Sequence, residues 1–460
     1  MSTRITDSRL YGHLWGTEET RAIFGEQGRL QGWLDVIAAL ARAQAAEGVI
    51  PPAAARAITS RARADLIDLD LAAEQTRHTR HSTLGLIRAL QAVLPEDARE
   101  YVYAGATVQD ITDSWTALAI RRAGAIAWRD LRRIEDQLLV LAVAHRTTVM
   151  PGRTHGQPGS PVTFGWKAAS WAEEIRRHLD RLRDGAPRWL VGQLGGGVGS
   201  LVFYSGRGLA VRARFCAELG LAEPAISWLS SRDRGAEFAQ VLALICGTLA
   251  RVGTEVYELQ RPEIGELAEP SPPGAVGSIT MPHKRNPEAS EHLDTLARLA
   301  RAQAGVMVEA VVAEHERDGR GWKAEWVVLP EICLLTAAAL QNGIELTGGL
   351  QVNAAAMRRN AERGVGSEQV LARLAPELGA RRAQTLLQEV LLLEALAADG
   401  NPAASGLTAA RALAEAGLLS EAEGLDLTGT LDTGACGDMV DLVVARARAA
   451  RAAEAARWPS

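Results

Sequence analysis

Apolar residues recur three and four positions apart along much of the chain, a spacing that predicts helices. The segments with this pattern are rich in Ala, Leu, Arg and Glu and cover 30–47, 112–145, 162–183, 234–260, 290–312 and 326–348. The alternating pattern of strands is weak. A helix over 112–145 would be about 50 Å long, a length typical of bundles and oligomers. The pattern therefore predicts an all-α fold in which some apolar helix faces contact other subunits.

Segments rich in Gly, Pro or polar residues interrupt the helical pattern at 97–110, 150–161, 191–208 and 263–287. The first of these segments ends a helical region, and we expect the other three to be loops. The last is longer than about 15 residues, and such loops in compact chains are usually functional or disordered. The breaks predict three parts: an N-terminal helical domain at 1–108, a central long-helix bundle at 109–350 that carries the longest loop, and a C-terminal helical domain at 351–460.

Composition excludes several classes of protein. The chain has 460 residues, 47% of them hydrophobic, and a net charge of −5, which is not typical of nucleic-acid binding. No apolar run is long enough to span a membrane, and the polar start lacks an apolar signal core. The four cysteines are far apart and are predicted to be reduced thiols. We therefore expect a cytoplasmic protein with neither nucleic-acid nor membrane partners.

Cofactor and metal motifs are missing from the sequence. The histidines and cysteines show no metal-ligand spacing. The glycine-rich run at 195–199 lacks the strand–helix context of a nucleotide-binding loop and is expected to be a tight turn. We therefore predict neither a cofactor nor a metal.

Lysine is rare: only three of the 50 basic residues are lysines, and 47 are arginines. A compact ammonium differs chemically from a planar guanidinium, so a lysine in such a chain either meets a specific need or is a chance survivor. The three are Lys167, Lys284 and Lys323. Lys167 falls within a predicted helix, where a packing or salt-bridge role is expected.

The segment 277–287, GSITMPHKRNP, concentrates reactive side chains within the longest loop. Ser278 offers a hydroxyl, Lys284 a cation and Asn286 an amide. Pro287 then opens a helix, a position that proline favours. Such a loop at a helix N-terminus is suited to binding a carboxylate. The alternative is a flexible surface linker.

GSITMPHKRNP also resembles the signature loop of the fumarase/aspartase superfamily. Segments 104–113, AGATVQDITD, and 152–157, GRTHGQ, are similar to the superfamily's first and second shared regions, in the same order. Segment 314–330, EHERDGRGWKAEWVVLP, resembles the 3-carboxy-cis,cis-muconate cycloisomerase and adenylosuccinate lyase branches. The resemblance implies a tetrameric core of long helices from four subunits, composite active sites and a small di- or tricarboxylate substrate.

The superfamily's chemistry is an anti elimination through an aci-carboxylate intermediate, whose extra negative charge needs preorganised donors. The resemblance implies that Ser278 is the base and that Lys284 and Asn286 bind the carboxylate. Thr154 and His155 match the second-region ligands, with His155 in an active-site role. In the first region, Thr107 and Gln109 would bind substrate beside Asp110.

Two further residues have open roles. His81 matches a histidine that lies near the substrate in adenylosuccinate lyases, but it could equally be a helix-end residue. Arg320, with Lys323, could bind an extra anionic group of the substrate. The alternative for this pair is a solvated loop between two helices.

Departures from the superfamily pattern narrow the range of possible substrates. Val108 and Ile279 replace expected hydroxyl residues, and Trp326 stands where adenylosuccinate lyases bind a phosphate through an arginine. These changes argue against adenylosuccinate. The resulting hypothesis is a lyase that breaks a C–N bond of a nitrosuccinate- or aspartate-like succinate and releases fumarate. The alternatives are a 3-carboxy-cis,cis-muconate cycloisomerase and a non-catalytic, crystallin-like structural protein.

Overall fold

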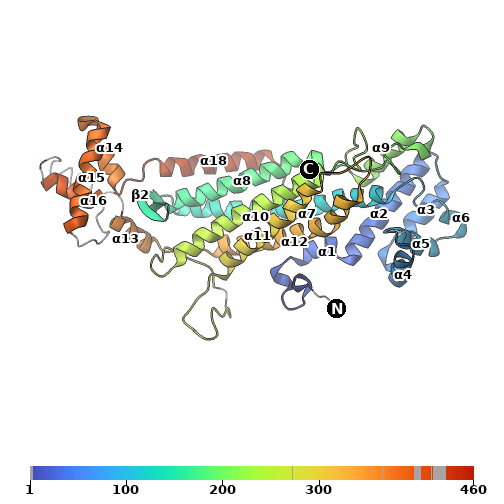
Figure 1. The fold of residues 1–460 in the computed structure, drawn as a ribbon, viewed down its shortest axis with the longest axis horizontal. Coiled ribbons are helices and arrows are strands. Elements are labelled where there is room, and N and C mark those ends of the chain that lie inside the picture. Colours follow the sequence, from blue (N-terminus) through green and yellow to red (C-terminus); the bar gives the residue numbers. More distant parts are fainter. Residues whose placement is uncertain are drawn as a thin grey trace.

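The computed structural model describes residues 4–271, 273–364, 366–397, 406–415, 417 and 431–459. Long helices lie side by side along the longest axis of an elongated molecule (Figure 1). The N-terminal helices cover one end of this bundle, and a group of short helices lies at the other end. The bundle helices are α7 (Val108–Ala144), α8 (Phe164–Trp189), α10 (Asp233–Gln260), α11 (Glu288–Glu309) and α12 (Gly319–Gly349).

These helices confirm the predicted all-α fold, although several begin earlier than the apolar pattern indicated. The largest difference is at α12, which begins at Gly319, seven residues before the predicted start. Asp318 is the cause: its side chain accepts a hydrogen bond from the amide of Arg320 and caps the helix. A cap of this kind stabilises a first turn whose glycines have low helix propensity.

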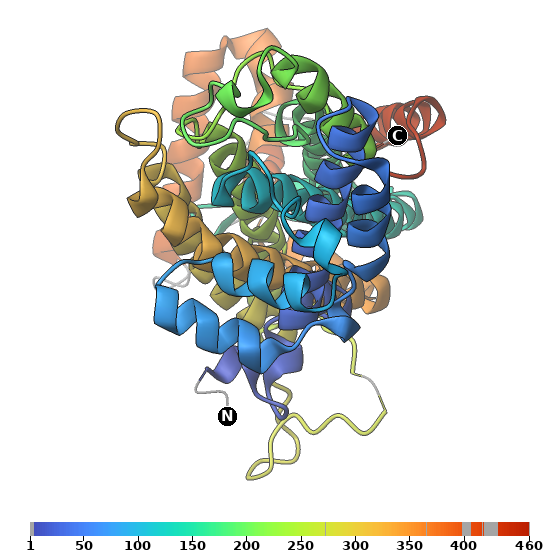
Figure 2. The same cartoon turned by 90° about the vertical axis from the view of Figure 1, so that its right-hand side faces the viewer.

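The N-terminal end is built from one longer helix, α2 (Glu26–Ala46), and five short ones: α1 (Glu18–Phe24), α3 (Pro52–Arg61), α4 (Leu69–Thr79), α5 (Leu84–Ala92) and α6 (Glu96–Arg99). α2 packs against the first half of α7. A Cβ atom at Gly32 would lie 2.2 Å from the Trp115 ring, so glycine is what lets α2 approach this closely. Farther along the chain, α9 (Gly208–Leu219) packs on α2 at the same end (Figure 2).

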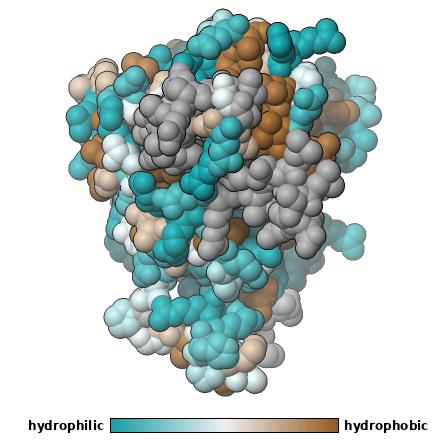
Figure 3. Space-filling model, turned by 90° about the vertical axis from the view of Figure 1, so that its left-hand side faces the viewer, coloured by the Kyte–Doolittle hydropathy of each residue, from teal (hydrophilic) through white to brown (hydrophobic). Residues whose placement is uncertain are grey.

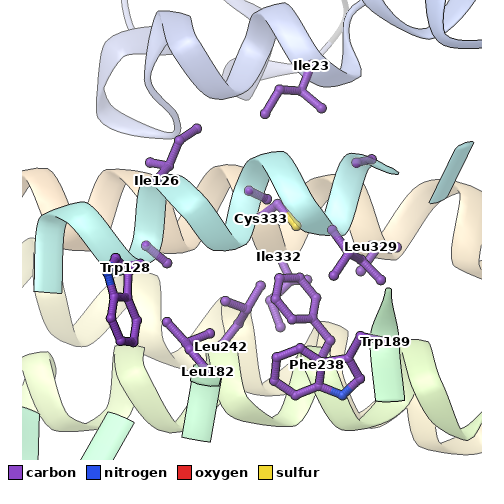
Figure 4. Close-up of a cluster of buried hydrophobic side chains, with 14 of the residues drawn as sticks. Ile23, Ile126, Trp128, Leu182, Trp189, Phe238, Leu242, Leu329, Ile332 and Cys333 are labelled. Atoms are coloured by element: carbon purple, nitrogen blue, oxygen red, sulfur yellow. The ribbon is translucent and has the colours of Figure 1, made fainter. Parts of the chain in front are cut away.

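One continuous hydrophobic core joins the N-terminal helices to the bundle. Figure 4 shows side chains from α1, α7, α8, α10 and α12 pointing toward one another, among them Ile23, Trp128, Trp189, Phe238 and Ile332. Trp189 and Phe238 meet edge to face, with ring centroids 5.2 Å apart. This shared core gives the N-terminal end and the bundle a fixed relative position.

The structure corrects the prediction of a loop at 150–161. This segment forms most of an antiparallel hairpin, with β1 (Val149–Thr154) paired to β2 (Gln157–Thr163). Glycines and prolines hid the strands from the sequence pattern. The turn residues His155 and Gly156 have φ values of 52° and 75°, as in the tight turns whose twist suits hairpins.

The chain beyond the bundle has its own small core. A short strand pair joins β3 (Leu267–Ala268) to β4 (Gln351–Val352), and α13 (Ala354–Gly364) follows. The helices α14 (Ser367–Leu378), α15 (Ala380–Ala397) and α16 (Gly406–Glu415) pack around a separate apolar cluster. Figure 3 shows this end, where hydrophilic residues cover most of the coloured surface.

The last helix, α18 (Cys436–Ala453), returns to the bundle and packs on α8. The predicted C-terminal part, 351–460, therefore contributes one helix to the central bundle. Its other described helices lie at the bundle's end. The division at 108 and 350 stays a prediction.

Two bundle helices, α10 and α12, are long and apolar enough to cross a membrane. In their most apolar windows, 67% and 83% of the residues are buried inside the fold, as expected of core helices. All four cysteines are buried and unbridged. Burial raises the pKa of the Cys246 thiol to about 11, so this thiol stays protonated at neutral pH.

Candidate active site

The first region lies where α7 begins, at the N-terminal end of the bundle. Thr107 caps α7, and its own amide donates to Asp110 Oδ2 at 2.8 Å, which completes a capping box. Asp110 is fully buried and also accepts from the amides of Gly195 and Gly196 at 2.8 and 3.0 Å. Burial raises the pKa of Asp110 to about 7, against the opposite effect of these hydrogen bonds. Asp110 therefore ties the glycine-rich loop to the start of α7.

Gln109 is buried beside Asp110. Its side-chain amide donates to the Leu229 carbonyl at 2.9 Å. Its Oε1 has no partner within the described part of the chain. The amide nitrogen of Gln109 therefore has a structural hydrogen bond, and the binding of substrate by Gln109 stays a prediction.

Arg317 is a residue of this region that the sequence reasoning missed. Its guanidinium donates to Thr107 Oγ1 at 2.5 Å and lies 5.8 Å from the centre of the Trp322 ring. The only sign of Arg317 in the sequence was its position in segment 314–330, which resembles two branches of the superfamily. Arg317 brings a positive charge from the start of α12 to the hydroxyl predicted to bind substrate.

The second region lies at the opposite end of the bundle, at the tip of the β1–β2 hairpin. Thr154 and His155 are both exposed there, and His155 holds the left-handed backbone conformation of the turn. Strain of this kind persists where surrounding structure enforces it. The neighbouring Arg153 supplies that support through two hydrogen bonds to Glu266, at 2.9 and 2.5 Å.

Glu266 is fully buried and connects the hairpin to the base of the signature loop. Besides Arg153, it accepts a hydrogen bond from Asn360 Nδ2 at 2.8 Å. The chain from 273 to 287 extends away from the bundle in both cartoon views (Figures 1 and 2). The hairpin and the loop base are therefore neighbours within one chain.

The tip of the signature loop has internal order. Ser278 Oγ accepts from the Met281 amide at 3.0 Å, and the Lys284 amide donates to the Met281 carbonyl at 2.9 Å. A Cβ atom at Gly277 would lie 2.5 Å from the Lys284 carbonyl oxygen, so this close approach requires glycine. Lys284 is exposed, and Asn286 Nδ2 donates to Glu288 Oε1 at 3.2 Å.

Glu269 is the second residue that sequence reasoning missed. Its carboxylate accepts from the amides of Ala289 and Ser290, at 3.1 and 2.7 Å, in the first turn of α11. The predicted anion site at this helix N-terminus is thus filled by the chain's own carboxylate. Binding of a substrate carboxylate by Lys284 and Asn286 stays a prediction.

The remaining predicted residues lie at the surface. His81 Nδ1 accepts from the Leu84 amide at 3.2 Å, at the start of α5. Arg320 is exposed and paired with Asp318 and Glu314, with shortest distances of 2.6 and 3.2 Å, which compensate its charge. Lys167 forms the predicted salt bridge, with Glu255 at 2.6 Å.

A single chain does not bring the three regions together. α7 has 37 residues, which places its two ends about 55 Å apart. Thr107 caps one end, and the hairpin with His155 follows the other (Figure 1). The signature loop is anchored at the hairpin end through Glu266. Thr107 and His155 of the same chain therefore cannot touch one small substrate.

Comparison with known proteins matches residues 16–301 to a model of a lyase family. The chain belongs to this lyase family. The matched residues include all three candidate regions and the bundle helices α7, α8 and α10, but not α12. This match confirms the expected place in the fumarase/aspartase superfamily.

The relatives described next align with this lyase over most of their length. N-acetyl-S-(2-succino)cysteine lyases of Dickeya dadantii and Enterococcus italicus are 41% and 38% identical to it. The alignments cover 85% of this chain and 86% of the first relative, and 97% and 98% for the second. The solved 3-carboxy-cis,cis-muconate lactonizing enzyme of Pseudomonas putida superposes with a TM-score of 0.87 at 34% identity. That superposition covers 96% of this chain and 99% of the enzyme.

Proposed function

We propose that this lyase catalyses anti β-elimination from a 2-substituted succinate and releases fumarate, with Ser278 as the base. The observation that carries the proposal is the hydrogen bond from the Met281 amide to Ser278 Oγ, at 3.0 Å. A serine hydroxyl is a weak base unless donors stabilise its alkoxide. The Met281 amide is such a donor, and Lys284 on the same loop adds a positive charge.

In the proposed step, Ser278 removes a proton from C3 of the succinate, the carbon next to the one that carries the leaving group. The resulting aci-carboxylate carries an extra negative charge, which Lys284 and Asn286 would stabilise. Its electrons then form the double bond as the bond to the leaving group breaks. We propose Thr107, Gln109, Thr154, His81 and Arg320 as substrate ligands and His155 as the second catalytic group. The exposed position of His155 on the hairpin tip supports that role.

For the leaving group we propose a thiolate. The support is the similarity to two N-acetyl-S-(2-succino)cysteine lyases, one of them along nearly the full length of both chains. A thiol has a pKa near 8.5, so its thiolate leaves without prior protonation. The C–N substrates expected from the sequence, aspartate and nitrosuccinate, remain the competing hypothesis.

A cycloisomerase is the second candidate. The structural similarity to the Pseudomonas putida lactonizing enzyme favours it, because that superposition includes nearly all of both chains. The same base and carboxylate ligands could act on a muconate tricarboxylate. Loss of the muconate chromophore without formation of fumarate would identify this reaction.

We further propose a homotetramer with composite sites, working in the cytoplasm. The separation of about 55 Å along α7 supports composite sites, because complete sites then need more than one chain. Exposed apolar residues on the bundle helices also support assembly, since such residues favour burial at an interface. They include Val140 on α7, Leu244 on α10 and Val308 on α11.

An ultraviolet assay for fumarate tests the reaction on a panel of substrates: N-acetyl-S-(2-succino)cysteine, aspartate, nitrosuccinate and 3-carboxy-cis,cis-muconate. We expect fumarate from the thioether substrate with the native chain and none with Ser278→Ala. Ser271→Ala is a matched control, because it removes another serine hydroxyl from the same loop. Equal rates for Ser278→Ala and the native chain would refute the proposed base.

A further inference from the structure

The last part of the chain forms a strap along the bundle. α18 begins beside the β1–β2 hairpin and lies against α8, so this C-terminal strap, residues 436–458, runs from the hairpin toward the middle of the bundle (Figure 1). α18 has 18 residues and is therefore about 27 Å long. Contacts at the two ends of the strap thus lie far apart and hold different parts of the fold.

Charged residues anchor the far end of the C-terminal strap. The side chain of Glu454 is 4% exposed, and its carboxylate accepts from Arg176 of α8 at 2.7 Å and from Arg132 of α7 at 2.5 Å. Arg176 also donates to the fully buried Glu135 at 2.6 Å. Because loss of one member of a buried ion network leaves a charge uncompensated, Glu454 holds the strap firmly on both helices.

Trp458 is a second anchor at this end. Its buried indole N–H group donates to the Leu182 carbonyl of α8 at 3.0 Å. Its ring packs on Gly124 of α7, where a Cβ atom would lie 2.2 Å from the ring, so this close approach requires glycine. The strap is therefore fixed to α7 and α8 by a tryptophan as well as by charges.

The other end of the C-terminal strap holds the root of the hairpin. Arg146, in the turn between α7 and β1, donates to both carboxylate oxygens of Asp441 on α18, at 3.0 and 2.7 Å. A Cβ atom at Gly437 would lie 2.8 Å from Arg146 Nη1, so the first turn of α18 closely approaches the same guanidinium. α18 also packs on β2. The strap thus contacts the chain where it enters the hairpin and along the second strand.

The hairpin has a second support in α13. This helix packs on β1, and its Asn360 donates to Glu266, which also binds Arg153 of β1. Both supports come from the C-terminal part of the chain, although the hairpin itself belongs to the central part. The position of the exposed hairpin tip, which carries His155, therefore depends on how the C-terminal part is fixed to the bundle.

We propose that the C-terminal strap positions His155 for catalysis, with Glu454 and Trp458 as its anchors and Arg146 as its link to the hairpin. These three are positioning residues. The two anchors lie about one length of α18 from the hairpin, and Arg146 is engaged by Asp441 at the hairpin root. They would act by fixing the hairpin from which His155 reaches a site completed by another chain. The inference rests on the proposed elimination.

A double-mutant cycle with His155→Ala tests the positioning role. We expect Trp458→Ala and Arg146→Ala each to lower kcat about tenfold and to change KM less than about twofold, because a displaced catalytic group slows the chemical step more than it weakens binding. In the His155→Ala background the same substitutions should lower kcat less than about twofold, since the group that they position is already gone. A general loss of folded protein would instead multiply with the effect of His155→Ala.

Arg188→Ala is the matched control, because Arg188 also pairs with a carboxylate, that of Glu237, but at the other end of α8. It should keep the native kcat. The side chain of Arg146 is 39% exposed, so Arg146→Ala should fold even if Trp458→Ala does not. An unchanged kcat in a folded Arg146→Ala variant, a full tenfold loss in the His155→Ala background, or a native kcat for His155→Ala itself would overturn the inference.

Hydrogen exchange separates this inference from the proposed reaction. The hairpin amides, 149–163, should exchange at least about tenfold faster in Trp458→Ala and Arg146→Ala than in the native chain, whereas the amides of α2 should not change. Faster hairpin exchange without fumarate from any succinate would refute the elimination and retain the hold of the strap on the hairpin. Fumarate formation with unchanged hairpin exchange would refute the role of the strap and retain the elimination.

Discussion

Composite active sites can be tested by restoring activity from two inactive chains. The most informative pair of variants is Thr107→Ala with His155→Ala, because α7 separates these two residues by about 55 Å in one chain. Each variant should lose activity on the order of a hundredfold, since each removes a group predicted to contact the reacting substrate.

In a mixed tetramer, a composite site draws Thr107 from one chain and His155 from another. With equal amounts of the two variants, each position is intact in about half of the sites, so about a quarter of all sites have both groups. We therefore expect about a quarter of the native rate. The two variants are coexpressed with different tags and purified through both tags in turn, and the rate of the purified mixed tetramers is then measured.

Each variant coexpressed with a second tagged copy of itself is the control, and it should stay inactive. Mixed tetramers verified by mass spectrometry that show no recovery would contradict composite sites. Thr107→Ala also removes a helix cap, which costs about 1 kcal/mol. The melting temperature of the variant therefore has to be measured beside its rate.

Three further predictions concern stability. Arg153→Ala should destabilise the fold by about 3 kcal/mol and lower activity, because it leaves the buried Glu266 carboxylate without its guanidinium; unchanged chemical denaturation would contradict this role. Burial, with a smaller effect of nearby Arg181, lowers the pKa of His178 to about 4, whereas an unfolded histidine titrates near 6.5. Stability should thus fall by up to about 3 kcal/mol as pH drops from 6.5 to 4, and His178→Gln should flatten this dependence in thermal melts. Lys167→Ala should change stability by less than about 1 kcal/mol, because its salt bridge to Glu255 is partly exposed; a larger loss would assign Lys167 another role.

The long helices were predictable from sequence because their burial repeats with the helical period. The start of α12 was not, because its first turn contains Gly319 and Gly321 and depends on the Asp318 cap. The hairpin was missed for a related reason. Its glycines and prolines are typical of loops, and the pairing of Val149 with Thr163 is a contact between segments that sequence periodicity does not encode.

The candidate site was predictable only as separate motifs. Ser278, Lys284 and His155 stand in recognisable segments, but the long-range contacts around these segments involve residues from elsewhere in the chain. Arg317 reaches Thr107 across 210 positions, and Glu269 reaches the start of α11 across about 20. Contacts of this kind depend on tertiary packing, and a single sequence carries no direct signal of them.

The carboxylate of Glu269 on the first turn of α11 has a consequence for how the enzyme responds to salt. A helix start acts as a fixed partial positive charge, and here an internal counterion already neutralises it. In the proposed reaction, attraction of a dianionic succinate to the signature loop then depends on the side-chain cations of Lys284 and Arg285, which are both exposed to solvent. Mobile ions screen such an exposed charge effectively, so capture of substrate by an open loop should weaken as ionic strength rises.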